Sequence, residues 1–296
     1  MFKTLNNFIE NEVKETNLDF YSVILGSKPS QGARSPKLWN KVYRFEKKNV
    51  RMIPLDVKEE NLKDLFSYLK EDTHCLGGAV AVPFKEKILS LIKDYVKEEI
   101  KVIGAVNCFY RSPSSPLINE FTGTNTDGEA ALEPIREYLE KSEDLAIGLI
   151  GFGGAGKAIL AFLLKDFKNR HRIHLFNRSV KKINNVKKIG VAVYSLRSLG
   201  SHLPQLDLLI NATSVGHAGD IDATPIPTRL LSKAKKTMLV YDIIYDPIKT
   251  TLLKNSERMG LRTINGLHMN LIQAVLAYSY TNSTSLSIAD IYKIMN

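Results

Sequence analysis

The chain has 296 residues, of which 44% are hydrophobic and 24% are charged, a composition that excludes a disordered or fibrous protein and favours a globular one. Its length suggests two domains of ordinary size. The formal net charge of +10 does not by itself indicate a nucleic-acid-binding protein, because the lysines are spread along the chain among ordinary helical residues.

The sequence also gives little indication of a targeting segment, a membrane helix or a disulfide framework. The amino-terminal stretch carries Glu10, Glu12 and Glu15 and lacks the apolar run of a signal peptide. No segment reaches the ~18 consecutive apolar residues that a membrane helix needs. The cysteines, Cys75 and Cys108, are too few for a disulfide framework and lack the spacing of metal ligands. We therefore expect a cytoplasmic protein with free thiols, without a metal, and without a membrane or nucleic-acid partner.

The first part of the chain alternates short apolar strands with amphipathic helices. Between the strands, Lys37–Phe45 and Lys58–Leu69 have the apolar periodicity of helices that bury one face. This alternation is typical of a mostly parallel α/β sheet. The predicted strands are Phe20–Leu25, Val50–Leu55, Gly78–Val82 and Ile103–Phe109.

The second part begins with a predicted helix over Asp127–Tyr138 and then alternates again. Leu271–Tyr280 is a late apolar helix that we expect to pack back on the first domain. The predicted fold is thus an α/β substrate domain, residues 1–126 plus 268–296, and a Rossmann-type, doubly wound dinucleotide-binding domain, residues 127–267. The strands expected in the second domain are Ala146–Ile150, Ile173–Phe176, Leu206–Asn211, Met238–Tyr241 and Arg262–Ile264.

A glycine-rich turn follows the first strand of the second domain. The apolar strand Ala146–Ile150 runs directly into Gly-Phe-Gly-Gly-Ala-Gly and then into an apolar helix. In a dinucleotide site, Gly151 permits the tight turn, Gly153 lets the backbone approach a pyrophosphate, and Gly156 lets helix and strand pack closely. The pyrophosphate would bind backbone amides at the start of the helix. The residues predicted to bind it are Gly151, Gly153, Gly154, Ala155 and Gly156.

The end of the next strand bears on the choice of cofactor. Sites that prefer NAD usually place an acidic residue there to accept a hydrogen bond from the ribose 2′-hydroxyl. This chain has Asn177 and Arg178 instead. Because a guanidinium gives forked donors to phosphate oxygens, we predict NADP as the cofactor; otherwise Arg178 is simply a surface cation.

Seven motifs occur in an order that resembles the shikimate dehydrogenase family. The resemblance covers about residues 20 to 275. The motifs are GGAVAVPFK (77–85), AVNC (105–108), GTNTDG (123–128), GFGGAGKA (151–158), NATSVG (211–216), YDIIYDP (241–247) and GLHMNLIQA (266–274).

The resemblance implies reversible reduction of a ring ketone by NADPH, with Lys85 and Asp127 beside the reacting oxygen. Such a pair can move the hydroxyl proton and stabilise developing charge. Taken singly, Lys85 would be read as a surface lysine and Asp127 as a helix N-cap. The resemblance further implies substrate contacts from Asn107 and Gln273, with Tyr245 near the nicotinamide. It implies cofactor contacts from Asn211, Thr213, Gly216 and Gly266.

The amino-terminal substrate motif departs from the family pattern. Where the family usually has Ser-x-Ser-Pro-x-x-His-Asn, this chain has Ala33 at the first serine and Trp39 at the histidine, whereas Ser35 is retained. Ala79 and Ala81 replace the asparagine and threonine of the family's Asn-Val-Thr segment. Each lost hydrogen bond to a charged group is worth roughly 1.5–3 kcal/mol.

A substrate carboxylate therefore needs other partners, and the loop Ser27–Arg34 offers two. Arg34 can bind a carboxylate with two parallel hydrogen bonds, and Ser30 can donate one. We expect shikimate to be a poor substrate, so that a related hydroxy acid such as quinate is an alternative. A catalytically weak, NADP-binding regulatory protein of the same fold is another. The expected partner is a small hydroxy acid, and the chain is expected to be a monomer or homodimer.

Overall fold

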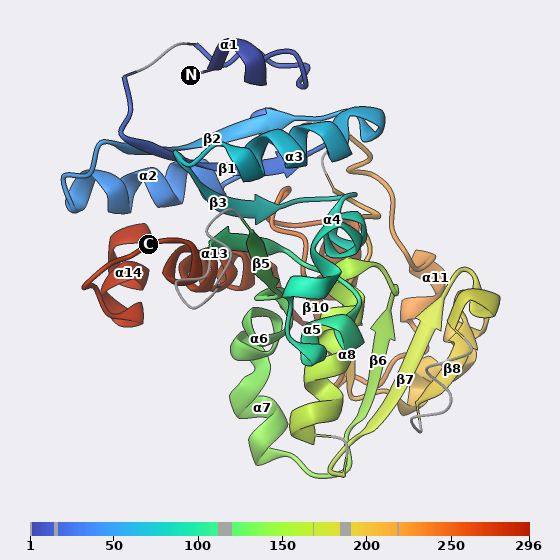
Figure 1. Ribbon diagram of the computed structural model, residues 1–296. Helices are drawn as coiled ribbons and strands as arrows, with labels where there is room; N and C mark the ends of the chain where they lie inside the picture. Colours follow the sequence, from blue (N-terminus) through green and yellow to red (C-terminus); the bar gives the residue numbers. More distant parts are fainter. Residues whose placement is uncertain (1, 15–16, 112–119, 168, 184–190, 218) are drawn as a thin grey trace. The chain divides into compact units, whose positions relative to one another are not determined.

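The computed structural model describes residues 2–14, 17–111, 120–167, 169–183, 191–217 and 219–296. The chain divides into two compact units (Figure 1). Unit 1 comprises Met1–Thr126 and Leu271–Asn296, and unit 2 comprises Asp127–Asn270. Each unit has its own sheet, and no described helix is long and apolar enough to cross a membrane.

Unit 1 contains a five-stranded sheet with the order β2-β1-β3-β4-β5. The first three of these strands pair in parallel, whereas β3–β4 and β4–β5 pair antiparallel, so the sheet is mixed. The strand bounds are β1 Phe20–Gly26, β2 Val50–Asp56, β3 Cys75–Val80, β4 Cys108–Arg111 and β5 Phe121–Thr124.

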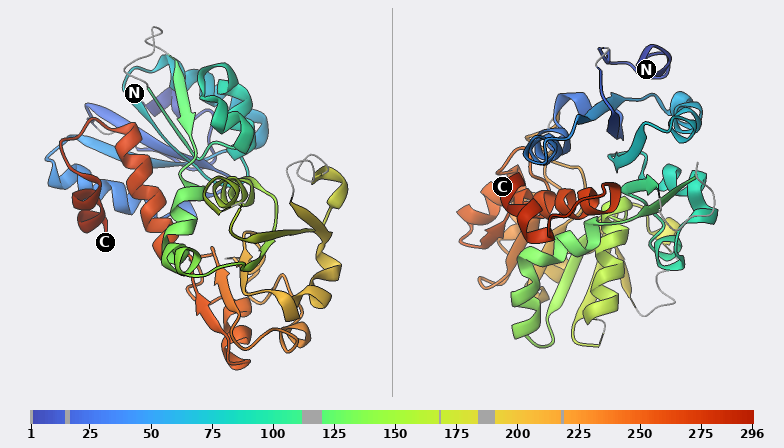
Figure 2. Two further views of the ribbon diagram at one scale, coloured as in Figure 1. Left: turned by 90° about the horizontal axis from the view of Figure 1, so that it is seen from below. Right: turned by 60° about the vertical axis from the view of Figure 1, so that its left-hand side comes forward.

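Helices cover both faces of this sheet. On one face, Ser22 and Ile24 of β1 point toward α2, Ser35–Phe45. On the other face, Tyr21 donates a hydrogen bond to Asp72, which follows α3, Leu62–Glu71. The carboxy-terminal helices α13 (Leu267–Thr281) and α14 (Ile288–Met295) lie beside α2, although they are more than 200 residues away in sequence (Figure 2). The short helices of unit 1 are α1 Phe2–Leu5, α4 Lys85–Ile92 and α5 Glu98–Ile103.

One predicted strand of unit 1 is wrong over its first five residues. We expected a strand over Ile103–Phe109, but Ile103 is the last residue of α5, and β4 begins only at Cys108. Ile100 and Ile103 are buried from one face of this short helix, which ends at Gly104 with φ of 75°. The apolar residues before Asn107 therefore belong to a helix end and a connection, and the strand is antiparallel to its neighbour.

Unit 2 contains a six-stranded, fully parallel sheet with the order β11-β10-β9-β6-β7-β8, which is the arrangement of a doubly wound, Rossmann-type fold. The order reverses at β6, the strand that precedes the glycine-rich turn. The strand bounds are β6 Ala146–Ile150, β7 Arg172–Asn177, β8 Ala192–Ser195, β9 Leu208–Asn211, β10 Leu239–Asp242 and β11 Arg262–Ile264.

Helices of unit 2 also pack on the sheet. A buried cluster joins Ile150, Phe176, Leu209 and Val240 of the strands to leucines of the helices after β8 and β10. The predicted helix Asp127–Tyr138 is interrupted by a 3-10 turn at Glu133–Ile135, because Pro134 cannot continue the helical hydrogen bonds. The helix bounds are α6 Asp127–Leu132, α7 Arg136–Lys141, α8 Gly154–Phe167, α10 Leu199–His202, α11 Thr228–Leu231 and α12 Thr251–Arg258.

Candidate functional site

The glycine-rich turn between β6 and α8 has the geometry that a dinucleotide site needs. Gly151 has a φ of 96°, which side-chain-bearing residues rarely adopt, and a Cβ there would lie 2.8 Å from Thr213. A Cβ on Gly156 would overlap the carbonyl oxygen of Gly151, so only glycine permits this approach of helix and strand. A Cβ on Gly153 would meet no atom within 4 Å, so its backbone is open to a ligand.

The first turn of α8 suits an anion. It consists of Gly154, Ala155 and Gly156 and contains no acidic residue. The amides at the start of a 14-residue helix lack intrahelical partners and carry a partial positive charge. Together with the open backbone at Gly153, this turn can bind a pyrophosphate.

The end of β7 carries no carboxylate. Asn177 is the last residue of this strand, and its side-chain amide donates to the carbonyl oxygen of Ser179. Arg178 follows and is exposed. The side-chain nitrogen of Asn177 thus stabilises the turn, while Arg178 is accessible to a ligand phosphate.

In unit 1, Lys85 occupies a defined place at the start of α4. It is half-buried, and its carbonyl oxygen accepts a hydrogen bond from the amide of Val106 at 2.9 Å. Val106 immediately precedes Asn107. The structure therefore joins the backbone of Lys85 to the segment that carries a predicted substrate residue.

Asn107 is 2% exposed and is tied to the residue before Asp127. Its amide nitrogen donates to the hydroxyl of Thr126 at 2.9 Å, and its amide oxygen accepts from the backbone nitrogen of Thr126 at 2.8 Å. Thr126 in turn donates to the carbonyl oxygen of Gln273 at 3.2 Å. Asn107, Thr126 and Gln273 are thus brought together, and Asp127, which is buried, follows Thr126 directly.

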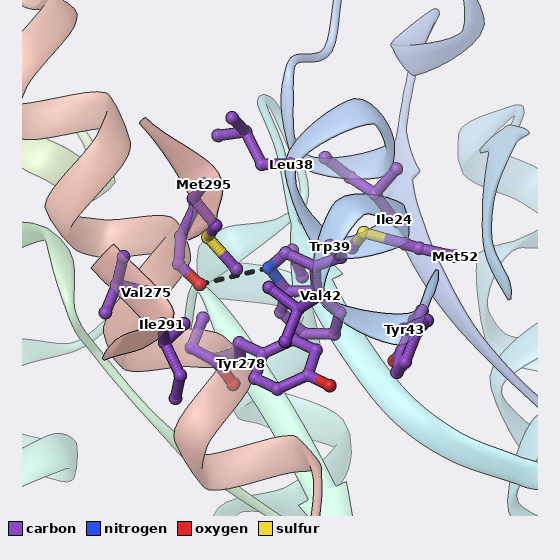
Figure 3. Packing of buried hydrophobic residues seen from close by; sticks show 14 of the residues in the cluster. Ile24, Leu38, Trp39, Val42, Tyr43, Met52, Val275, Tyr278, Ile291 and Met295 are labelled. Atoms are coloured by element: carbon purple, nitrogen blue, oxygen red, sulfur yellow. Dashed lines mark hydrogen bonds between the residues drawn. The ribbon is translucent and has the colours of Figure 1, made fainter. Parts of the chain in front are cut away.

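Trp39 belongs to the core of unit 1. It is fully buried, its ring packs edge-on against Tyr278, and its indole nitrogen donates to the carbonyl oxygen of Ala274 at 3.0 Å (Figure 3). Ala33 and Ala81 pack against the same cluster, and Ala79 is buried in it. The positions that depart from the family motif therefore contribute an apolar surface continuous with the core.

The three residues considered for a substrate carboxylate differ in their surroundings. Ser30 donates its hydroxyl and its backbone nitrogen to the carboxylate of Asp56, so its proton is already used. Ser35 is buried as the first residue of α2. Arg34 is half-buried at the N-cap of the same helix, and its carbonyl oxygen accepts from Leu38.

Hydrogen bonds to other residues of unit 2 hold the loop after β9 in place. Asn211 is fully buried; its amide nitrogen donates to Asp242 at 3.0 Å, and its amide oxygen accepts from the backbone and hydroxyl of Thr213. Asn211 therefore supports the loop, and Thr213 is the more exposed of the two predicted residues. Sequence reasoning missed Asp242, which is a polar residue at the carboxyl end of a buried strand, the position where ligand sites occur in such sheets.

Tyr245 and Gly266 lie around the turn that follows β10. Tyr245 is half-buried and contacts His217 edge-to-face, with ring centroids 6.4 Å apart. Gly266 donates its backbone nitrogen to the carbonyl oxygen of Ile244, and a Cβ there would overlap the backbone of Ile243. Glycine at 266 is thus required by close packing of two backbone segments. The described residues include no group of three or more side chains suited to a metal ion.

Comparison with known proteins identifies the family. The shikimate dehydrogenase substrate-binding domain matches residues 25–109. Shikimate dehydrogenase (NADP(+)) of Methanocaldococcus jannaschii is 31% identical over 84% of this chain and 87% of its own. The enzyme of the same name from Bacillus licheniformis is 34% identical over 75% of this chain and 77% of its own. A shikimate dehydrogenase crystallised with NADP+ aligns with a TM-score of 0.78 and 26% identity, over 93% and 94% of the two chains. The chain belongs to the shikimate dehydrogenase family.

Proposed function

We propose that the chain is an NADP-dependent oxidoreductase that interconverts a ring ketone and the corresponding alcohol. The proposed ketone and alcohol are 3-dehydroshikimate and shikimate, or the corresponding pair of a related cyclic hydroxy acid. Lys85 and Asp127 are the proposed acid/base pair. The observation that carries this proposal is the turn from Gly151 to Gly156, whose conformation and open backbone at Gly153 fit a pyrophosphate, in a chain that belongs to this family.

The proposed cofactor contacts follow from the strand ends of unit 2. The amides from Gly153 to Gly156 bind the pyrophosphate, and Arg178 binds the 2′-phosphate. Thr213 and Tyr245 lie on two loops that we propose to receive the nicotinamide end of the cofactor. Bound NADPH would supply the hydride, and the chain's own residues would supply the proton and orient the ring.

The proton step is assigned to Lys85 and Asp127. Oxidation of an alcohol requires removal of its hydroxyl proton as hydride leaves, and reduction requires the reverse. An ammonium donates a proton or hydrogen bond to the oxygen, and the carboxylate orients that oxygen. The hydrogen bond from Val106 to Lys85 and the two hydrogen bonds between Asn107 and Thr126 support these positions.

Few side chains of this chain are available to bind the carboxylate of shikimate. Ala33, Ala79 and Ala81 donate no side-chain hydrogen bond, and Ser30 is already bonded to Asp56. We therefore propose Arg34 and Ser35 as the carboxylate-binding residues. We further propose that shikimate turns over less efficiently than a hydroxy acid that places an apolar face near the alanines.

The test is an NADP(H) absorbance assay with shikimate, quinate and related hydroxy acids. We expect NADP-dependent turnover of at least one of them. Lys85→Ala and Asp127→Asn should each lower kcat by roughly 10²–10⁴-fold, the usual contribution of acid–base catalysis. Lys87→Ala on the same helix and Glu129→Gln beside Asp127 are matched controls that should retain activity. Activity that survives Lys85→Ala and Asp127→Asn would refute the site, and absence of NADPH binding would refute the function.

A further inference from the structure

A buried carboxylate, Asp242, links three separate segments of unit 2. It is the last residue of β10 and has no exposed surface. One carboxylate oxygen accepts from the side-chain nitrogen of Asn211 at 3.0 Å and from the backbone nitrogen of Ile244 at 3.2 Å. The other accepts from the hydroxyl of Thr250 at 2.7 Å. Asp242 makes no ion pair with any residue in the described part of the chain.

These hydrogen bonds have a fixed direction, because an ionised carboxylate can only accept. The amide of Asn211 must turn its nitrogen to Asp242, which leaves its oxygen to face Thr213. The hydroxyl proton of Thr213 is then donated to Asn211 at 2.7 Å, and the same hydroxyl oxygen accepts from the backbone nitrogen of Val215 at 3.2 Å. The charge on Asp242 thus sets the orientation of the Asn211 amide and, through it, of the Thr213 hydroxyl that accepts from Val215.

The same carboxylate also fixes the turn that carries Tyr245. Its bond to the Ile244 nitrogen holds this turn, and the carbonyl oxygen of Ile244 accepts from Gly266. Thr250 is the N-cap of α12 and lies against Gly216, at the end of the first loop. The contact between His217 and Tyr245 joins the two loops a second time.

We propose that Asp242 is a positioning residue that holds the loop 211–216 and the turn 243–245 in the conformation that receives the nicotinamide end of the cofactor. This assignment rests on the proposed function for its ligand and on the hydrogen bonds for its mechanism. Asp242 acts through Asn211, Thr213 and Ile244 and does not itself touch the cofactor.

Protonation of Asp242 would release this arrangement. Burial raises the pKa of Asp242 to about 6, against an ordinary value of 3.8, and its hydrogen bonds oppose this rise only in part. A neutral carboxyl group can donate as well as accept, so the amide of Asn211 is free to turn over and Thr213 loses its acceptor. The titratable group that Asp242 acts on is the neighbouring phenol of Tyr241, whose pKa is raised by burial and by this charge.

The experiment compares Asp242→Ala and Asp242→Asn with a matched control, Asp207→Ala. Asp207 precedes β9 at the opposite end of the sheet, where it accepts from the backbone of Ala146 and pairs with Lys235. The readouts at neutral pH are the NADPH dissociation constant and amide hydrogen exchange of Thr213, Val215 and Ile244. Asp242→Ala should weaken NADPH binding and speed exchange by about tenfold, the effect of losing one or two hydrogen bonds. Asp242→Asn should recover part of both, because its amide oxygen still accepts from Asn211 and Ile244.

Three results would overturn the assignment: unchanged exchange in Asp242→Ala, equal losses in Asp207→Ala, or no recovery in Asp242→Asn. If Asp242→Ala does not fold, the wild-type protein gives the test. The amide NMR signals of Thr213, Val215 and Ile244 should titrate together with one midpoint near pH 6, and independent titration or none would contradict the proposal. The exchange and NMR readouts need no cofactor, so they separate a failure of this inference from a failure of the proposed function.

The pH dependence of NADPH binding needs one precaution. The 2′-phosphate of the cofactor titrates in the same range as Asp242. We therefore compare the ratio of the wild-type and Asp242→Asn dissociation constants, in which the ligand's own titration cancels. This ratio should change by about tenfold between pH 7.5 and pH 5, and a constant ratio would overturn the role of the charge.

Discussion

The buried charge of Asp242 should make the folding stability of the chain depend on pH in a specific direction. The pKa of this carboxyl group is 3.8 ordinarily and about 6 in the folded protein. Between these values the unfolded chain loses the proton while the folded chain keeps it. The free energy of unfolding that Asp242 contributes is therefore fully present below about pH 4 and is lost as pH rises through 6. With about 1.4 kcal/mol per pKa unit, the loss is about 3 kcal/mol.

Asp242→Asn removes this titration and keeps a side chain of the same shape. The difference in free energy of unfolding between wild type and Asp242→Asn should thus change by about 3 kcal/mol from pH 4 to pH 7, with the wild type relatively more stable at the acidic end. Urea unfolding followed by circular dichroism at several pH values measures this difference, in which the titrations of all other groups cancel. Parallel curves for the two proteins would refute the reasoning, as would a difference of opposite sign.

Three further predictions concern other parts of the two units. Arg178→Ala should raise the NADPH dissociation constant by about tenfold or more and leave NADH binding unchanged, because a charged hydrogen bond to the 2′-phosphate is lost. Calorimetric titration with both cofactors measures the two effects. Equal effects on NADPH and NADH would exclude a role of Arg178 in binding the 2′-phosphate. Trp39→Phe should lower the free energy of unfolding by about 2–3 kcal/mol, since it removes the bond to Ala274 and leaves a cavity, and a urea midpoint equal to that of the wild type would contradict this. Burial, His202 and Arg172 lower the pKa of His174 from its ordinary value of 6.5. The stability that neutral His174 supports should therefore be complete above pH 6.5 and be lost as pH falls from 6.5 through the lowered pKa of the folded protein. His174→Phe should flatten this part of the stability profile, and an unchanged acid slope would be inconsistent with the reasoning.

Where the sequence predicted the fold well, local geometry left few alternatives. The turn after β6 has glycine at the positions where a positive φ and a close helix–strand approach occur, Gly151 and Gly156. A continuous apolar strand before that turn and an apolar helix after it predicted the parallel unit. These features depend on near neighbours in sequence, so the pattern alone was sufficient.

The sequence misled where an element is short or where the partners of a side chain are distant in the chain. Ile103 was assigned to a strand, although its burial with Ile100 belongs to a helix of only six residues. The strand β8, Ala192–Ser195, was missed because it is short and all its residues are only half-buried. The side-chain partners of Asp242, Asn211 and Thr250, lie 31 residues before it and 8 after it, so no local pattern shows that its carboxylate is buried and hydrogen-bonded to them.

The candidate site was predictable in its residues and less so in its contacts. The family resemblance selected Lys85, Asn107 and Gln273. Only the structure shows that the side-chain amide of Asn107 makes hydrogen bonds with Thr126 through both its nitrogen and its oxygen. Likewise, the replacement of a family histidine by Trp39 could be read from the sequence, whereas its complete burial against Tyr278 could not. Side-chain direction depends on packing between elements that the sequence does not place.

The proposed function is tested most directly by the ratio of kcat/KM for NADP+ to that for NAD+, measured with the hydroxy acid that turns over fastest. We predict a ratio of at least about ten, since Arg178 offers the 2′-phosphate a charged partner and no carboxylate ends β7. A ratio below one, or no cofactor-dependent turnover of any cyclic hydroxy acid, would contradict the assignment of this chain as an NADP-dependent dehydrogenase.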